Sequence, residues 1–419
     1  MRGAGRCCSI AATGGPAIAT ADTFVEAAPR ASVAPPAAAA TRLVALDVFR
    51  GATIAGMILV NNPGSWSAIY WPLEHAPSHG WTPTDLIFPS FLFIVGVSMT
   101  LSFASRAKKG VTRAAVARHV AWRSLLIFAI GLFMAAEPYF RMGTVRIPGV
   151  LQRIAVCYLV SGVFVLGVWR EPEQSENDRR LVAPVAALIV FLLVGYWAAM
   201  TFIPVPGYGV GRLDPDGNLG AYIDRKVMGA HLWSQSKTWD PEGIMSTFPA
   251  IATTLTGVLV GLWLRSRRTP QMKVVGMLAM GAAGLVAGEL LHPFFPINKN
   301  LWTSTYVIFT SGFAMMLLAL CYWAVDIRGW RRWATPFVIF GTNAIAVFTF
   351  SGLLAKASVI YKVTRADGRQ VTWHSYVYNK LFVPFASPIN ASLLFAISYV
   401  LLWFFLMWLL YRKRIFIKI

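Results

Sequence analysis

The sequence predicts an all-α, polytopic membrane helix bundle, and three observations lead to this fold class. Of the 419 residues, 56% are hydrophobic and only 13% are charged, whereas a soluble chain carries about 25% charged residues. The apolar residues gather in runs of the roughly 20 residues that an α-helix needs to cross a bilayer. The basic residues fall in short clusters between these runs, as in multi-pass proteins. A soluble globular enzyme is therefore excluded.

Residues 1–42 come first along the chain and are rich in Ala, Pro, Gly and Thr. They lack the sustained apolar stretch of a signal peptide, so we expect a disordered cytoplasmic tail or a translation start assigned too early. About ten transmembrane helices follow, most of them flanked by Trp, Tyr, Pro or basic residues. The predicted spans are 43–62, 84–105, 119–139, 149–169, 182–203, 244–264, 272–291, 301–325, 335–356 and 389–411.

The distribution of Lys and Arg predicts which way the bundle faces. Of the 38 basic residues, 23 lie on the side that holds both termini, 12 on the other side and three within spans. Cytoplasmic loops carry the excess of Lys and Arg, so both termini are predicted to be cytoplasmic. The same clustering argues against nucleic-acid binding, despite a net charge of +20.

Four loops, near 62–84, 204–243, 292–300 and 357–388, then face the opposite compartment. The loop over 204–243 is far longer than a connection requires and is rich in Pro, Gly, Asp and Asn. Such a composition indicates an ordered binding loop. We therefore expect a ligand to bind on this side of the membrane.

The first of these loops contains the best candidate for acid–base chemistry. Asn61 ends the first span, and His75 and His79 follow in the loop. Histidine exchanges a proton near neutral pH, and a neighbouring amide can fix its tautomer. A metal site is disfavoured, because no HExxH pattern is present and Pro77 prevents a helix that would align the two rings. On spacing alone, a structural histidine at the interface is an equal alternative.

Charged and amide side chains near span ends form the second signal, since ionisable groups inside a membrane are costly unless they are paired or hydrated. Asp47 and Arg50 can pair with each other or contact a ligand. Asp85 is interpreted as a helix cap or structural partner. Arg146, Gln152 and Arg153 surround the start of the fourth span, where guanidinium groups and free N–H groups suit a phosphate or carboxylate. The eighth span opens with a similar set, namely Asn298, Lys299, Asn300 and Trp302.

Several of these motifs resemble, in the same order, those of the heparan-α-glucosaminide N-acetyltransferase family of transmembrane acetyltransferases. The matching segments are LDVFRG (46–51), VN (60–61), EHAPSHG (74–80), DLIFPSFLFIVG (85–96), VRIPGVLQRI (145–154), AYIDR (221–225), DPEGI (240–244), INKNLWTSTY (297–306) and YRKRIFIKI (411–419). The resemblance covers about 42–419 and implies a bacterial member with a transmembrane acyltransferase domain over 43–419.

The resemblance implies transfer of an acetyl group from cytosolic acetyl-CoA to the amine of a glucosamine unit on the far, periplasmic side of a bacterial inner membrane. His75 matches the catalytic histidine of the family and Asn61 its supporting asparagine. The family also implies a homodimer. This chain differs from the animal pattern by Glu74, Pro77 and His79, which leaves the identity of the acceptor sugar open.

Two mechanisms follow for this reaction, and both use His75. In the preferred one, His75 acts as a general base in a ternary complex while Asn61 orients the imidazole or donates to the thioester oxygen. In the other, His75 carries the acetyl group as acetyl-imidazole. A sugar or acyl-carrier transporter or flippase remains the alternative function, although no internal repeat supports it.

The remaining assignments concern the two substrates, and no metal is expected. The phosphates of CoA require cations, although terminal basic residues such as Arg412 and Lys413 can also serve only topology. The candidate CoA-binding residues are Arg50, Arg146, Gln152, Arg153, Arg412 and Lys413. The candidate acceptor-binding residues are Asp240, Glu242, Asn298, Lys299, Asn300 and Trp302.

Overall fold

The computed structural model describes residues 43–168, 175–365 and 368–417. The predicted tail over 1–42 lies outside the described residues. Within the described part, almost all regular structure is helical, and one two-stranded hairpin is present. The all-α prediction is therefore confirmed.

Nine of the predicted spans appear as helices long and apolar enough to cross a membrane within the described residues. α2 is preceded by a 3-10 turn over Pro83–Leu86, and α9 continues as a π-helical turn over Tyr322–Ile327. These helices are α1 (Val44–Asn61), α2 (Ile87–Lys108), α3 (Arg113–Ala136), α4 (Val150–Val168), α5 (Ser175–Phe202), α7 (Ile244–Arg265), α8 (Pro270–Leu291), α9 (Ser304–Cys321) and α13 (Pro388–Arg412).

The predicted span over 335–356 is not one straight helix. It consists of α10 (Thr335–Thr342) and α11 (Ala344–Ile360), which meet at an angle of 81°. Asn343 stands at the break, where its Nδ2 donates to the carbonyl of Ile415 at 3.2 Å and its Oδ1 accepts from the N–H of Ile417 at 2.8 Å. The chain after α13 thus turns back, and its backbone binds the side chain of Asn343 at the break.

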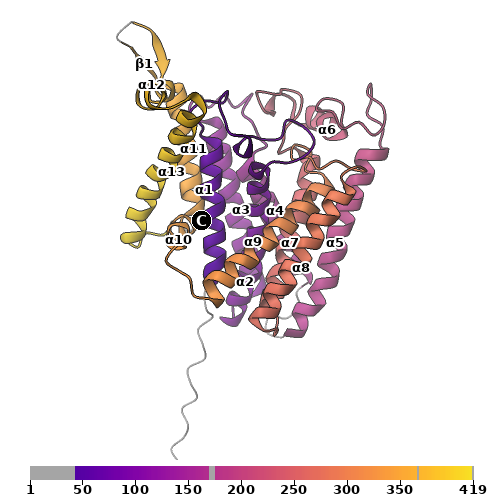
Figure 1. Cartoon of the computed structure of the whole chain (residues 1–419). Coiled ribbons are helices and arrows are strands. Elements are labelled where there is room, and N and C mark those ends of the chain that lie inside the picture. The colour runs from indigo at the N-terminus through magenta and orange to yellow at the C-terminus, as the bar shows by residue number, and fades with distance from the viewer. Residues whose placement is uncertain (1–42, 169–174, 366–367, 418–419) are drawn as a thin grey trace, which may run out of the picture. The chain divides into compact units, whose positions relative to one another are not determined.

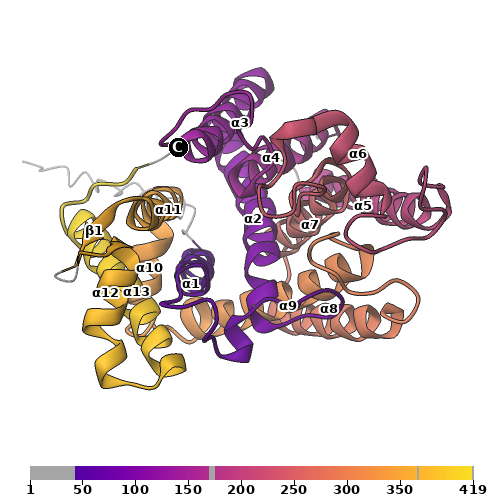
Figure 2. The ribbon, with the colours of Figure 1, turned by 90° about the horizontal axis from the view of Figure 1, so that it is seen from above.

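The helices are arranged in two groups on either side of α1 and α2. Viewed from above, α10, α11 and α13 lie together beside α1, while α5, α7 and α8 lie beyond α2 (Figure 2). α9 contacts both α1 and α2. The close crossing of α2 and α7 depends on glycine. A Cβ added at Gly96 would lie 1.9 Å from the carbonyl oxygen of Thr254, and one at Gly257 would lie 2.1 Å from that of Phe93. Small residues of this kind allow membrane helices to approach at backbone distance.

The long loops gather at one end of the bundle, which we call the loop end (Figure 1). The loop over 204–243 contains α6 (Leu219–Met228), which is capped by the side chain of Asn218. The loop over 357–388 contains β1 (Lys362–Thr364), paired antiparallel with β2 (Gln370–Thr372), and α12 (Trp373–Leu381). The backbone N–H of Gly80 donates to the carbonyl of Ile297 at 2.8 Å, which joins the first loop to the segment before α9. The first loop and the segment before α9 are therefore connected.

Candidate active site

His75 lies at the loop end and is held by Asp85. The Nδ1 atom of His75 is 2.8 Å from Oδ1 of Asp85, whose side chain is only 1% exposed, while that of His75 is 44% exposed. The other carboxylate oxygen, Oδ2, accepts hydrogen bonds from the backbone N–H groups of Ala76 (3.0 Å) and Thr82 (3.1 Å). Asp85 is thus fixed by the same loop whose histidine it contacts.

This geometry selects one tautomer of the imidazole. A carboxylate at Nδ1 holds the proton on that nitrogen, so the lone pair that can accept a proton is on Nε2. Asp85 also forms a capping box with Thr82, as its interpretation as a cap requires. The contact of Asp85 with His75 was not predicted from the sequence, because a Thr-x-x-Asp pattern before an apolar run indicates only a cap.

Lys299, from the segment just before α9, completes the group. Its Nζ lies 2.9 Å from Nδ1 and 3.1 Å from Nε2 of His75, and 3.4 Å from Oδ1 of Asp85. Burial lowers the pKa of the Lys299 ammonium below its ordinary value, although the charge of Asp85 opposes this shift. We call His75, Asp85 and Lys299 the triad. The triad brings together a base, a carboxylate that orients it and a cation.

Lys299 is positioned by the turn before α9. The N–H of Asn298 donates to Thr303 Oγ1 at 3.1 Å, and Asn298 Oδ1 accepts from the N–H of Leu301 at 2.9 Å. Nδ2 of Asn298 also lies 3.2 Å from Nδ1 of His79. Asn298 therefore connects the lysine segment to the histidine loop.

Asn61 and three of the candidate CoA-binding residues do not contact the triad within the described residues. Asn61 ends α1 with an exposed side chain, and no hydrogen bond joins it to His75 within the described residues. Arg50 lies eleven positions earlier, roughly 16 Å along the helix, where it contacts Asp47 (3.2 Å) and Ser98 (2.7 Å). Arg412 and Lys413 are exposed at the end of α13, with the Arg412 guanidinium 5.5 Å from the ring centre of Trp408.

Arg146 is paired with the two carboxylates expected to line the acceptor pocket. It binds Asp240 with two N–H groups at 2.8 and 2.6 Å and Glu242 with one at 2.5 Å. The Asp240 side chain is fully buried in this pair. The sequence prediction assigned Arg146 to CoA and Asp240 and Glu242 to the acceptor, and the structure places all three in one ion cluster at the loop end.

Arg153, Gln152 and Trp302 are buried below this cluster, all at most 5% exposed. Arg153 donates to Oγ of Ser246, and its guanidinium lies 5.0 Å from the ring centre of Trp302. Trp302 donates through Nε1 to Thr253 at 3.1 Å. Trp302 is thus a core residue in this structure.

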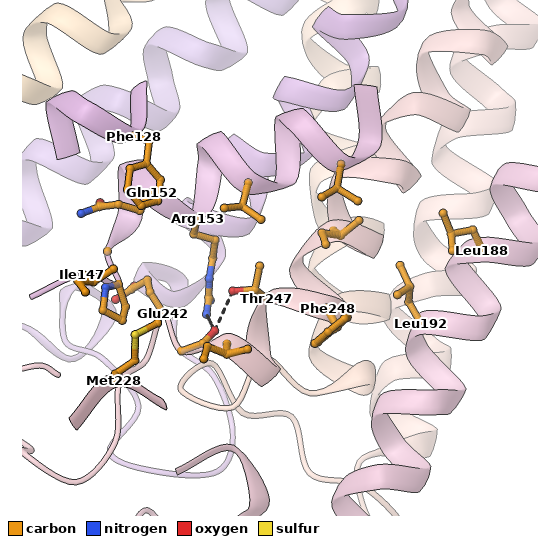
Figure 3. A pocket seen from close by; sticks show the side chains of 17 residues that line it. Phe128, Ile147, Gln152, Arg153, Leu188, Leu192, Met228, Glu242, Thr247 and Phe248 are labelled. Atoms are coloured by element: carbon orange, nitrogen blue, oxygen red, sulfur yellow. Dashed lines mark hydrogen bonds between the residues drawn. The ribbon is translucent and has the colours of Figure 1, made fainter. Parts of the chain in front are cut away.

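Two hollows adjoin these residues. A polar pocket of about 70 Å³ is lined by Pro77 and Ser78 of the histidine loop, together with Asp224, Asp240, Ser246, Asn298 and Asn300. Sequence reasoning missed Asp224, whose pKa burial raises to about 6. An apolar cavity of about 410 Å³ lies on the other side of Arg153 (Figure 3). Within the described residues, no three His, Cys, Asp or Glu side chains gather to hold a metal ion, and the expectation of no metal stays a prediction.

The fold and this site together define a class: a multi-pass α-helical membrane protein with a histidine–carboxylate–lysine group at the end of its bundle. The sequence model described as "Heparan-alpha-glucosaminide N-acetyltransferase, catalytic" matches residues 42–287. The chain belongs to this family, as its motifs predicted.

Two curated relatives carry the name heparan-alpha-glucosaminide N-acetyltransferase. The human protein is 33% identical over 366 residues, which cover 76% of this chain and 53% of the human protein. The mouse protein is 33% identical over 356 residues, which cover 74% of this chain and 53% of the mouse protein. The chain thus spans about half the length of these relatives.

Proposed function

We propose that this protein is a transmembrane N-acetyltransferase that moves the acetyl group of acetyl-CoA to the amine of glucosamine or a glucosamine-containing sugar. The observation that carries the proposal is the triad, in a chain of this family. We further propose that the donor is cytosolic, the acceptor periplasmic and the membrane a bacterial inner membrane, with a homodimer as the working assembly. Family membership and the predicted orientation support these assignments.

In this reaction, the sugar nitrogen attacks the thioester carbonyl, so that a C–N bond forms and the C–S bond of acetyl-CoA breaks. Nε2 of His75 accepts the proton that the nitrogen loses and returns it to the departing CoA thiolate. Asp85 holds the Nδ1 proton and stabilises the imidazolium formed in this step. Amide formation is thereby supplied with a route for its one proton.

The thioester oxygen gains negative charge as the nitrogen attacks, and two side chains are available to stabilise it. The Lys299 ammonium lies beside the imidazole. Asn61 is exposed at the end of α1. Because Asp85 already orients His75, we assign Asn61 to the thioester oxygen rather than to the imidazole.

The binding assignments divide along the bundle. For the CoA phosphates we propose Arg50, Arg412 and Lys413, which lie away from the triad. Arg146, Gln152 and Arg153 lie at the loop end, so we assign them to the thioester arm or the acceptor instead. Asp240, Glu242, Asn298 and Asn300 would shape the acceptor side, with Trp302 supporting Arg153 from below.

The first test measures N-acetylglucosamine formed from acetyl-CoA and glucosamine by protein in nanodiscs. We expect His75→Ala to lower kcat at least 100-fold, because general-base catalysis contributes about 10²–10⁴-fold. His79→Asn is the matched control, since His79 lies in the same loop but contacts Asn298, and it should stay within threefold of wild type. Undiminished turnover in His75→Ala would contradict the site. Stabilisation by glucosamine with no response to CoA would favour a transporter.

A second test separates direct transfer from an acetyl-histidine intermediate. Protein is mixed with radiolabelled acetyl-CoA without acceptor, quenched and analysed by peptide mapping. Direct transfer in a ternary complex leaves His75 unlabelled. Label on His75 that moves to glucosamine when the sugar is added would establish the covalent route instead.

A further inference from the structure

The apolar cavity beside Arg153 is not used by the proposed chemistry. All but four of its 17 lining residues are apolar or glycine. α4 and α5 form its sides; α5 packs chiefly on α7 and α4 on α3 and α7, whereas α4 and α5 pack only weakly on each other. Figure 3 shows Arg153 and Glu242 at one end and Leu188, Leu192 and Phe248 at the other. Arg153 and Glu242 thus lie at one end of an otherwise mainly apolar cavity, next to Phe128, Ile147 and Met228.

The cavity occupies only part of the membrane thickness. Its lining runs from Gly149, just before α4 at the loop end, along that helix to Val160, a rise of roughly 15 Å. The last eight residues of α4, to Val168, do not line it. Val160 and Phe248 are 41% and 45% exposed in the membrane-spanning part of the bundle. The cavity therefore borders the bilayer at these two residues.

Arg153 supplies the polar feature of this cavity. It is 2% exposed, and its Nε and Nη1 have no hydrogen-bond partner in the part of the chain that the structure describes. The neighbouring carboxylates, Asp240 and Glu242, are bound by Arg146. Buried donors without partners are costly. They favour a ligand that brings acceptor oxygens to the end of a hydrocarbon chain.

We propose that the acceptor is an amino sugar carried on a lipid, whose hydrocarbon chain lies in the cavity between α4 and α5. Its linkage oxygens accept hydrogen bonds from Arg153, and its sugar faces the polar pocket. Ser246 connects the two hollows, because it accepts a hydrogen bond from Arg153 and lines the polar pocket. Pro77 and Ser78, which follow His75 closely in the chain, line the same pocket. This inference rests on the proposed acetyltransferase function.

The test compares two acceptors, methyl β-glucosaminide and dodecyl β-glucosaminide, in nanodiscs with acetyl-CoA. The readout is the ratio of kcat/KM for the dodecyl compound to that for the methyl compound, measured in each variant. Val160→Trp fills the cavity. Val163→Trp is the matched control, since Val163 lies one turn further along α4, is 55% exposed and does not line the cavity. Partition of the dodecyl chain into the bilayer affects all variants equally.

We expect a ratio of at least 10 in wild type and Val163→Trp, and a fall of at least fivefold in Val160→Trp. An unchanged ratio in Val160→Trp, or no chain preference in wild type, would overturn the inference while leaving glucosamine acetylation intact. Retention of dodecyl β-glucosaminide in native mass spectra supplies a readout that needs no turnover. Loss of retention in Val160→Trp alone supports the cavity even if the acetyltransferase proposal fails, and equal retention in both variants contradicts it.

Discussion

At the scale of single residues, the site depends on a carboxylate that serves two partners. Asp85 uses Oδ1 for His75 and Oδ2 for the backbone of its own loop. One side chain thus sets both the tautomer of the base and the shape of the loop that carries it. This arrangement places the base and its support in one rigid turn.

Replacing Asp85 by Asn tests this dual role. We expect Asp85→Asn to lower kcat by about 10²–10⁴-fold, because an amide does not stabilise the imidazolium as a carboxylate does. We expect a stability loss of about 1 kcal/mol from the weakened cap. Steady-state kinetics and thermal unfolding measure the two effects, with the exposed Asp216→Asn as control. A kinetic effect no larger than that of Asp216→Asn would remove Asp85 from the mechanism.

The lowered pKa of Lys299 predicts how kcat/KM falls on the alkaline limb of its pH profile. Burial lowers its pKa, so it loses its charge at a lower pH than an ordinary lysine as the pH rises. The oxyanion contact is then lost, and kcat/KM should fall at a pH below the ordinary lysine value. Lys299→Arg should move this limb upward, because a guanidinium keeps its charge. A limb at the same pH in both proteins would mean that another group titrates.

At the scale of elements, the crossing of α2 and α7 sets the distance between the histidine loop and the acceptor loops. α2 follows directly on Asp85, and α7 follows on Asp240 and Glu242. The contact at Gly257 is therefore a structural determinant of the site, although it lies within the membrane.

Gly257→Ala should destabilise the protein by about 1–3 kcal/mol, because the added Cβ would meet the carbonyl oxygen of Phe93 and force the helices apart. Thermal unfolding in detergent measures the loss. Gly195→Ala is the matched control on α5, since a Cβ there meets nothing within 4 Å. Equal melting temperatures for the two variants would show that α2 and α7 can separate freely.

At the scale of the whole molecule, the basic residues predict the orientation. Two cysteine-substitution variants test this orientation. Ser67→Cys places a cysteine in the loop over 62–84, and Lys109→Cys places one in the loop between α2 and α3; both positions are exposed. In intact cells, a membrane-impermeant maleimide should label the first and not the second, in a background without Cys7 and Cys8. Labelling of Lys109→Cys alone would reverse the orientation and the side on which the acceptor is bound.

The sequence predicted the helices better than their interruptions. The apolar runs located nine spans to within seven residues at either end, because each span must be apolar along its own length. It did not predict the bend at Asn343, since the apolar run continues through that residue and the backbone groups that bind its side chain lie more than 70 residues later. The ion cluster of Arg146 with Asp240 and Glu242 was missed for the same reason.

The sequence by itself determined the membrane class, the helices and the family, because a bilayer selects each segment by its local composition and motifs are local strings. Only the tertiary structure joined Lys299 to His75, which is 224 positions away, and placed Asp85 on the imidazole. The tertiary structure also forms a cavity beside Arg153, which no sequence motif indicates. These features depend on which helix faces which, and that choice is made by side-chain packing between distant segments.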